Sequence, residues 1–204
     1  MSTSGERLEH LRTRLFEAEA GLLYKGSATR LVFGDGDPDA DLMIVGEAPG
    51  ADEDRLGLPF VGPSGHLLDA TLQRAGLERH RVYITNVIKR RPPNNRDPES
   101  HEIAISVPWL HAQIAVIRPK VILAVGRFAA GTLATRLGTP ISILRTSTLT
   151  YQNEKTKVIA PMIATFHPAY ILRQVDDART ACLELFAGDV RHAVELVRGE
   201  DLGL

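Results

Sequence analysis

The stretch Leu42-Met43-Ile44-Val45-Gly46-Glu47-Ala48-Pro49-Gly50 decides how the rest of the sequence is interpreted. Its first four residues are all apolar, which is typical of a parallel strand that is covered on both faces. A loop with two glycines and a proline follows at once and ends the strand. Because ligands of open α/β sheets bind beyond the carboxyl ends of the strands, we expect chemistry near Glu47.

Strands and helices alternate through the remaining sequence. Apolar runs predict strands at 82–88 and 121–125 and a hairpin within 147–166. Three-to-four spacing of apolar residues predicts helices at 3–22, 65–75, 97–117 (kinked or broken at Pro108), 126–137 and 177–197. The fold class expected is α/β, a three-layer α/β/α sandwich with a central, mainly parallel four-stranded sheet, in a single domain over residues 1–204.

The composition excludes several classes of protein. Of the 204 residues 44% are hydrophobic and 24% are charged, which is usual for a globular chain and excludes a disordered one. No apolar run approaches the roughly 20 residues that span a bilayer, and the N-terminus lacks the layout of a secretory signal. The single cysteine, Cys182, excludes an internal disulfide and a multi-cysteine metal centre. With 24 Lys and Arg against 25 Asp and Glu, a polyanionic partner needs a local basic patch.

Three segments that are distant in the sequence follow predicted strands. Glu47 follows the strand at 42–45, Asn86 lies near the end of the next strand, and His167 follows the last one. The carboxyl ends of parallel strands share one edge of the sheet, so we expect these side chains to converge on one crevice.

Other motifs are near-misses. The acidic turn at 35–39 lacks the glycine and the glutamate of a calcium loop, and no Lys-Ser/Thr pair follows Gly50 as in a P-loop. The segment 62–66 has His66 where an esterase elbow needs glycine. Its backbone N–H groups at a helix start still suit an anion such as a DNA phosphate.

Four blocks occur in order: GEAPGADED (46–54), GLPFVGPSGHLL (57–68), VYITNVIKRRPPNNRDP (82–98) and FHPAYILR (166–173). Together they resemble the signature motifs of the uracil-DNA glycosylase superfamily, and most of all family 4, its bacterial and archaeal branch. The resemblance extends from about Val32 to Arg173. It implies an enzyme of base excision repair that flips uracil out of DNA and hydrolyses its N-glycosidic bond, which leaves an abasic site.

The sequence departs from that family at four cysteines, which hold a [4Fe-4S] cluster in family 4. The third cysteine position is Arg90 and the fourth is Ser106, and the first two fall near Glu19 and Leu22. Because such clusters need thiolate ligands, we expect no cluster, no other cofactor and no metal here.

The resemblance also implies the residues that act on the sugar and the leaving base. A carboxylate favours an oxocarbenium-like sugar, and a hydrogen-bond donor favours a departing uracil anion. Glu47 matches an acid that positions or activates water, and Glu53 matches an acid implicated in some branches, so both stay open as the catalytic acid. His167 is expected to donate to uracil O2.

The same resemblance implies the residues that hold the base. Phe60 matches the family's stacking phenylalanine, and Gly46 and Ala48 line the pocket beside it. The amide of Asn86 suits the N3–H and O4 of uracil and rejects the reversed pattern of cytosine.

Two basic segments and the start of a helix are expected to contact the phosphates of the DNA. Apolar residues after His167 are expected to insert into the space that the flipped base leaves. The residues are Ser64, Lys89, Arg90, Arg91, Arg96, Tyr170, Leu172 and Arg173.

The partner expected is DNA that contains uracil or a related deaminated base, met by a monomer in the cytoplasm with no membrane contact. An alternative is a cluster-free protein that binds uracil or lesions in DNA with weak or no glycosylase activity. A small-molecule enzyme is disfavoured, because the phosphate and nucleophile motifs are missing.

Overall fold

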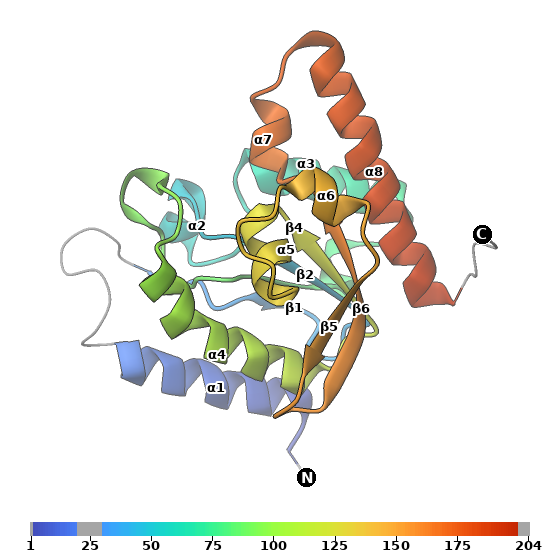
Figure 1. The fold of residues 1–204 in the computed structure, drawn as a ribbon. Coiled ribbons are helices and arrows are strands. Elements are labelled where there is room, and N and C mark those ends of the chain that lie inside the picture. The colour runs from blue at the N-terminus through green and yellow to red at the C-terminus, as the bar shows by residue number, and fades with distance from the viewer. Residues whose placement is uncertain (1, 20–29, 200–204) are drawn as a thin grey trace.

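The computed structural model describes residues 2–19 and 30–199, which form a central sheet between two layers of helices (Figure 1). The helices are α1 (Ser4–Glu19), α2 (Ala51–Leu56), α3 (Pro63–Arg74), α4 (Ser100–Ile117), α5 (Arg127–Leu133), α6 (Ile141–Arg145), α7 (Pro168–Leu172) and α8 (Asp176–Arg198), with short 3-10 turns η1 (Arg79–Arg81) and η2 (Pro93–Asn95). The strands are β1 (Asp35–Gly36), β2 (Leu42–Gly46), β3 (Tyr83–Asn86), β4 (Val121–Val125), β5 (Leu149–Asn153) and β6 (Val158–Thr165).

The described sheet has six strands in the order β1-β3-β2-β4-β6-β5. The four central strands β3, β2, β4 and β6 are parallel, which confirms the predicted parallel core. The predicted count of four strands is wrong for the whole sheet, because β1 and β5 add an antiparallel strand at each edge. β5 and β6 form the predicted hairpin.

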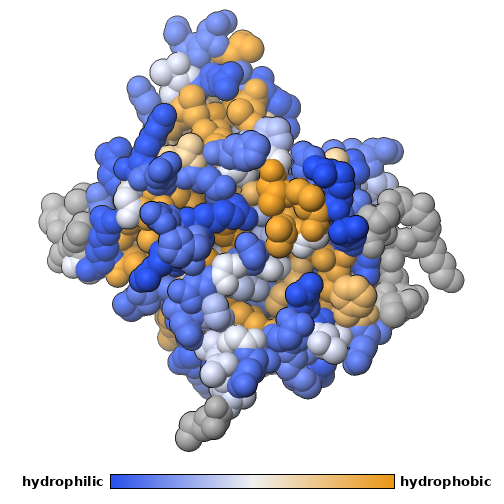
Figure 2. Space-filling view, turned by 180° about the vertical axis from the view of Figure 1, so that it is seen from behind, coloured by the Kyte–Doolittle hydropathy of each residue, from blue (hydrophilic) through white to orange (hydrophobic). Residues whose placement is uncertain are grey.

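Alternate residues of each central strand face opposite layers, as the pleat of a strand requires. In β2, Met43 and Val45 pack into the core under α1, α4 and α5, whereas Leu42 and Ile44 pack against α3 and α8. Helices therefore shield both faces of the sheet from solvent, which accounts for the unbroken apolar run of this strand. From behind, the surface is mostly hydrophilic with limited apolar areas (Figure 2).

The helix boundaries correct the sequence predictions in places. The capping box at the start of α1 is confirmed by hydrogen bonds between Thr3 and Glu6 in both directions. α4 begins at Ser100 rather than after Asp97, and it runs past Pro108 as one helix, so the predicted break is wrong. α5 ends at Leu133 rather than near residue 137. The predicted extension of the first helix to Leu22 lies outside the described residues.

No helix within residues 2–19 and 30–199 is long and apolar enough to cross a membrane.

Candidate active site

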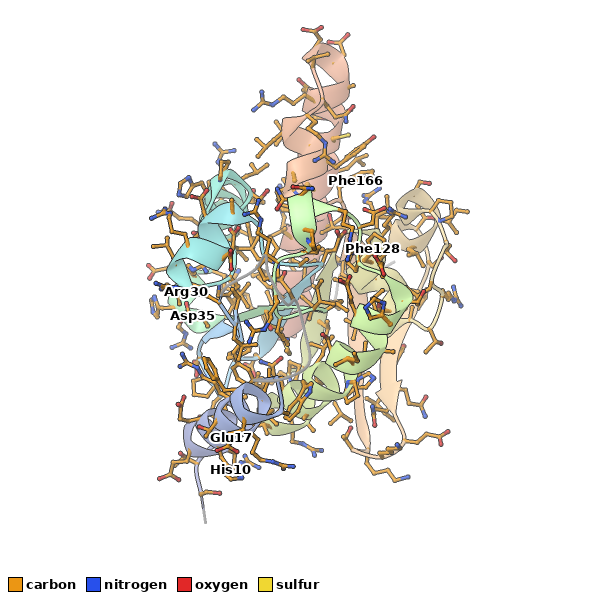
Figure 3. All side chains as sticks on the ribbon, turned by 90° about the vertical axis from the view of Figure 1, so that its left-hand side faces the viewer. His10, Glu17, Arg30, Asp35, Phe128 and Phe166 are labelled. Atoms are coloured by element: carbon orange, nitrogen blue, oxygen red, sulfur yellow. The ribbon has the colours of Figure 1, made fainter. Side chains whose placement is uncertain are left out.

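A cavity of about 440 Å³ opens beyond the carboxyl ends of the parallel strands. Figure 3 places Phe166, which lines this cavity, in the upper half of the view, whereas His10 and Glu17 of α1 lie near the bottom. The predicted site residues that line it are Glu47, Ala48, Glu53, Phe60, Ser64, Asn86, Arg96, His167, Tyr170 and Arg173. The fold therefore brings the four separate sequence blocks to one cavity.

Glu47 follows the last residue of β2 and is half-buried at the cavity wall. The pKa of its carboxyl is raised from 4.5 to about 7, chiefly by burial and next by the nearby charge of Asp97. The charges of Arg127 and Arg173 act in the opposite direction and lower that pKa. Glu47 therefore exchanges its proton close to neutral pH, as a general base should.

Glu53 lies in α2 and also lines the cavity, but its carboxylate accepts hydrogen bonds from main-chain N–H groups. One oxygen accepts the N–H groups of Val61 and Gly62 at 2.8 and 2.9 Å, and the other accepts the N–H of Gly50 at 3.0 Å. Glu53 thus fastens two loops of the cavity wall together. This geometry favours Glu47 over Glu53 as the acid that acts on a substrate.

Asn86 is the last residue of β3, and its side chain is 1% exposed. Neither its amide nitrogen nor its amide oxygen has a hydrogen-bond partner among the described residues. A buried polar group without a hydrogen-bond partner costs free energy. Because this amide lines the cavity, a ligand bound there can supply the missing hydrogen bonds.

Gly46 lies beside Asn86 in the parallel register of β2 and β3. A Cβ at Gly46 would lie 2.4 Å from the Asn86 amide oxygen and 2.5 Å from a ring carbon of Phe60. Glycine is thus required here because the amide and the ring approach the backbone so closely.

Phe60 is 5% exposed and has a left-handed backbone with φ of 49°, which is strained for a residue with a side chain. Arg79 of η1 braces this turn by donating hydrogen bonds to the carbonyl oxygens of Pro59 and Phe60 at 2.6 and 3.0 Å. Arg79 is itself paired with Asp69 of α3 at 2.9 Å. The phenyl ring lies 5.8 Å from the His167 ring, centroid to centroid.

His167 ends the segment after β6 and caps the short helix α7. Its Nδ1 accepts the N–H of Ala169 at 3.1 Å. The pKa of the imidazole is lowered from 6.5 to about 4, chiefly by burial and next by the charge of Arg173, while the charge of Glu53 acts in the opposite direction. The ring is therefore neutral at physiological pH and carries its proton on Nε2.

The side chains of two predicted DNA contacts are bonded to other groups of the protein. Lys89 is 1% exposed, and its ammonium group is bonded inside the protein, so the prediction of a phosphate contact is wrong for this residue. Arg96 lines the cavity, but it pairs bidentately with the buried carboxylate of Glu102 at 2.7 and 2.9 Å. Arg96 therefore ties the loop before α4 to the first turn of that helix.

The other predicted DNA contacts remain at or near the surface. Ser64 lies in the first turn of α3 and lines the cavity. Tyr170 is 42% exposed and stacks on Phe166, with 5.6 Å between ring centroids. Arg173 is exposed at the cavity, whereas Arg90, Arg91 and Leu172 are partly buried and do not line it.

Sequence reasoning misses an ion pair at the cavity between Asp97 and Arg127, which is 2.5 Å long. Arg127 follows Gly126 at the carboxyl end of β4, so the same topological rule that finds Glu47 and Asn86 also indicates this residue. The sequence places Asp97 only at the start of the helix predicted at 97–117, and its position at the cavity depends on how the preceding loop folds.

The third and fourth of the positions that correspond to the family 4 cysteines, Arg90 and Ser106, do not fit an iron–sulfur cluster. Arg90 offers no lone pair to a metal, and Ser106 is a buried hydroxyl on α4. Cys182 lies in α8, on the other face of the sheet. Within the described ranges, no three His, Cys, Asp or Glu side chains are grouped as metal ligands.

A family model covers the residues that form this sandwich and its cavity. The model of the "Uracil DNA glycosylase superfamily" matches residues 33–191, and the chain belongs to this superfamily.

Individual relatives carry names from the same superfamily. A type-4 uracil-DNA glycosylase of Thermotoga maritima is 36% identical over 98% of this chain and 100% of its own length. Type-4 enzymes of Archaeoglobus fulgidus and Sulfurisphaera tokodaii are 44% and 43% identical, each over 71% of this chain. These two matches cover 73% and 66% of the respective relatives.

Proposed function

We propose that the protein is a uracil-DNA glycosylase, which flips uracil out of DNA and hydrolyses its N-glycosidic bond to leave an abasic site. The observation that carries this proposal is the buried amide of Asn86, unpartnered among the described residues, in the cavity that Phe60 and His167 also line. The names of the type-4 relatives support the same activity.

Recognition of the base rests on Asn86 and Phe60. The amide oxygen accepts from N3–H of uracil while the amide nitrogen donates to O4, which satisfies both orphaned atoms at once. Cytosine presents an unprotonated N3 and an amino group. The amide oxygen would then face another acceptor, and the amide nitrogen would face another donor. The Phe60 ring stacks on the flipped base, a contact worth about 1–3 kcal/mol per base.

Cleavage breaks the bond between C1′ of the sugar and N1 of uracil, and the bonding electrons leave with the base. The Nε2–H of neutral His167 donates to O2 and stabilises the uracil anion. The Glu47 carboxylate stabilises the positive charge on the sugar and takes a proton from the water that adds to C1′. Solvent then protonates the released uracil.

DNA outside the cavity is held by exposed charge and by main-chain N–H groups. Arg173 lies at the cavity rim, and the start of α3 at Ser64 offers N–H groups to a phosphate. Arg91 extends this basic surface along the loop after β3. We expect a monomer that acts in the cytoplasm, where its DNA substrate would be.

We further propose that the enzyme works without an iron–sulfur cluster, because Arg90 and Ser106 cannot ligate iron. The protein purified under strict exclusion of oxygen should be colourless and contain no stoichiometric iron or acid-labile sulfide. A brown protein with about four irons per chain would contradict this proposal.

The test of the activity is an incision assay after alkaline treatment, on U·G, U·A, single-stranded uracil and hypoxanthine substrates. Wild type should excise uracil, and Glu47→Gln, Asn86→Asp and His167→Ala should each lose about 10²-fold or more in kcat. Glu184→Gln, an exposed site on α8, is the matched control and should equal wild type.

Two outcomes would refute this assignment. Activity that is indifferent to all three substitutions would remove the site. Tight binding of every substrate without excision would identify a protein that only binds lesions.

A further inference from the structure

A buried polar network lies directly behind Asn86. Its members are Thr85, which directly precedes Asn86, Lys89, which lies three residues after it, and Gln113 of α4. Thr85 and Gln113 are fully buried and Lys89 is 1% exposed, so the network is shielded from solvent. The mechanism above uses none of these three side chains.

The Lys89 ammonium donates three hydrogen bonds in this network. The acceptors are the main-chain oxygen of Asn86 at 2.7 Å, the Thr85 hydroxyl at 2.7 Å and the Gln113 side-chain oxygen at 2.6 Å. The lysine therefore ties the main chain at Asn86 to its own strand and to the helix layer.

The acceptors of Lys89 are themselves held in place. The Thr85 hydroxyl donates to the carbonyl oxygen of Phe33 at 2.7 Å. The Gln113 amide nitrogen donates to the same carbonyl at 2.8 Å and contacts the Tyr83 hydroxyl at 3.2 Å. Each donor thus has an acceptor, and a fully satisfied buried network of this kind fixes one arrangement.

We propose that Lys89 is a positioning residue that sets the direction of the Asn86 amide and thereby the affinity for the uracil base. This inference rests on the proposed function. Asn86 is the last paired residue of β3, and its side chain has no hydrogen-bond partner among the described residues. Only packing and the main chain then orient the amide, and Lys89 holds that main chain by its carbonyl.

The positioning role differs in its consequences from a DNA contact. A lysine that binds a phosphate contributes to the salt dependence of DNA binding, with a slope change of about one per contact. A buried lysine behind the base pocket leaves that slope unchanged. It affects only those steps in which Asn86 touches the base.

A double-mutant cycle with Asn86→Ala tests the inference, using kcat/KM for excision from a single-stranded uracil oligonucleotide. Lys89→Met should lower kcat/KM about tenfold or more in the wild-type background, as expected for the loss of a charged hydrogen bond. In the Asn86→Ala background the same change should cost less than about twofold, because the residue that Lys89 positions is already gone. Lys120→Met, at a surface lysine that directly precedes β4, is the matched control.

Thr85→Val provides a second cycle if Lys89→Met fails to fold. Valine keeps the branched shape on the strand and removes one of the three acceptors, so we expect a loss of about threefold that also disappears with Asn86→Ala. Thermal unfolding verifies that each variant is folded.

Binding to DNA that contains a tetrahydrofuran abasic site supplies the second readout. Affinity and salt slope should stay within about twofold of wild type for both variants, because no base enters the pocket. Losses that add independently of Asn86, or a reduced salt slope for Lys89→Met, would overturn the inference. An inactive wild type would instead speak against the proposed function itself.

Discussion

His167 Nδ1 accepts a hydrogen bond from the main-chain N–H of Ala169, which places the ring proton on Nε2 and directs a neutral donor at the cavity. A protonated imidazole could not accept this bond, so the local backbone of α7 and the low pKa of the ring support each other.

The first prediction concerns the titration of His167. Its resonances in NMR spectra should titrate with a midpoint near pH 4. Because the folded pKa of about 4 lies below the ordinary 6.5, the unfolded chain binds the proton first. This residue's contribution to stability is complete above that ordinary value and is lost as the pH falls toward 4. A midpoint at the ordinary value would contradict the buried, neutral ring.

The second prediction concerns Glu47 and its neighbour Asp97. Because the carboxylate is the active form, kcat/KM should rise with pH through about 7 in wild type. Asp97→Asn removes a charge that raises the Glu47 pKa, so the rise should move to lower pH, and Arg127→Met should move it to higher pH. Identical profiles for all three proteins would show that another group controls the rate.

The third prediction concerns the stability cost of Glu47. Its folded pKa of about 7 exceeds the ordinary 4.5, so the folded protein holds the proton more tightly than the unfolded chain. The free energy of unfolding therefore decreases as the pH rises between these two values, and Glu47→Gln should abolish this decrease. Chemical unfolding of both proteins across this pH range provides the measurement. An equal decrease in the variant would assign the effect to a different residue.

The fourth prediction compares two glycines. Gly46→Ala forces the Asn86 amide and the Phe60 ring apart and should lower kcat/KM at least about 10²-fold. Gly188→Ala in α8 meets no atom within 4 Å and should stabilise the protein by about 0.5–1 kcal/mol with unchanged activity. Equal activity of the two variants would mean that the pocket tolerates a wider spacing.

The fifth prediction separates stability from function at Asn86. Asn86→Ala removes a buried amide that makes no hydrogen bond to a described residue, so the melting temperature should stay equal or rise although excision is lost. Differential scanning calorimetry beside the incision assay checks both parts. A marked drop in melting temperature would assign Asn86 a structural role.

The parallel core of the fold can be predicted from the sequence because its strands are continuous apolar runs. Leu42 to Val45 and Val121 to Val125 are buried on both faces, so pattern and structure agree. The two-residue strand β1 and the short helices α2, α6 and α7 give no periodicity over so few residues. Their existence follows from tertiary contacts.

The convergence of the site is predictable for a related reason, since Glu47, Asn86 and His167 each lie at or just beyond the carboxyl end of a parallel strand. The environment of a side chain is less accessible to sequence reasoning. Lys89 opens a basic segment and looks like a surface charge, yet its acceptors include Gln113, which is 24 residues away in the chain. Glu53 likewise resembles a free acid until its main-chain partners are known.

The brace that Arg79 forms has a consequence for how sequence variants of this protein should be interpreted. Arg79 does not line the cavity, yet its two bonds hold the strained turn that carries Phe60. If only residues that line the cavity were considered, a substitution of Arg79 would be predicted to leave activity unchanged. Genetic variation at this arginine should nevertheless be weighed together with variation at the aromatic ring itself.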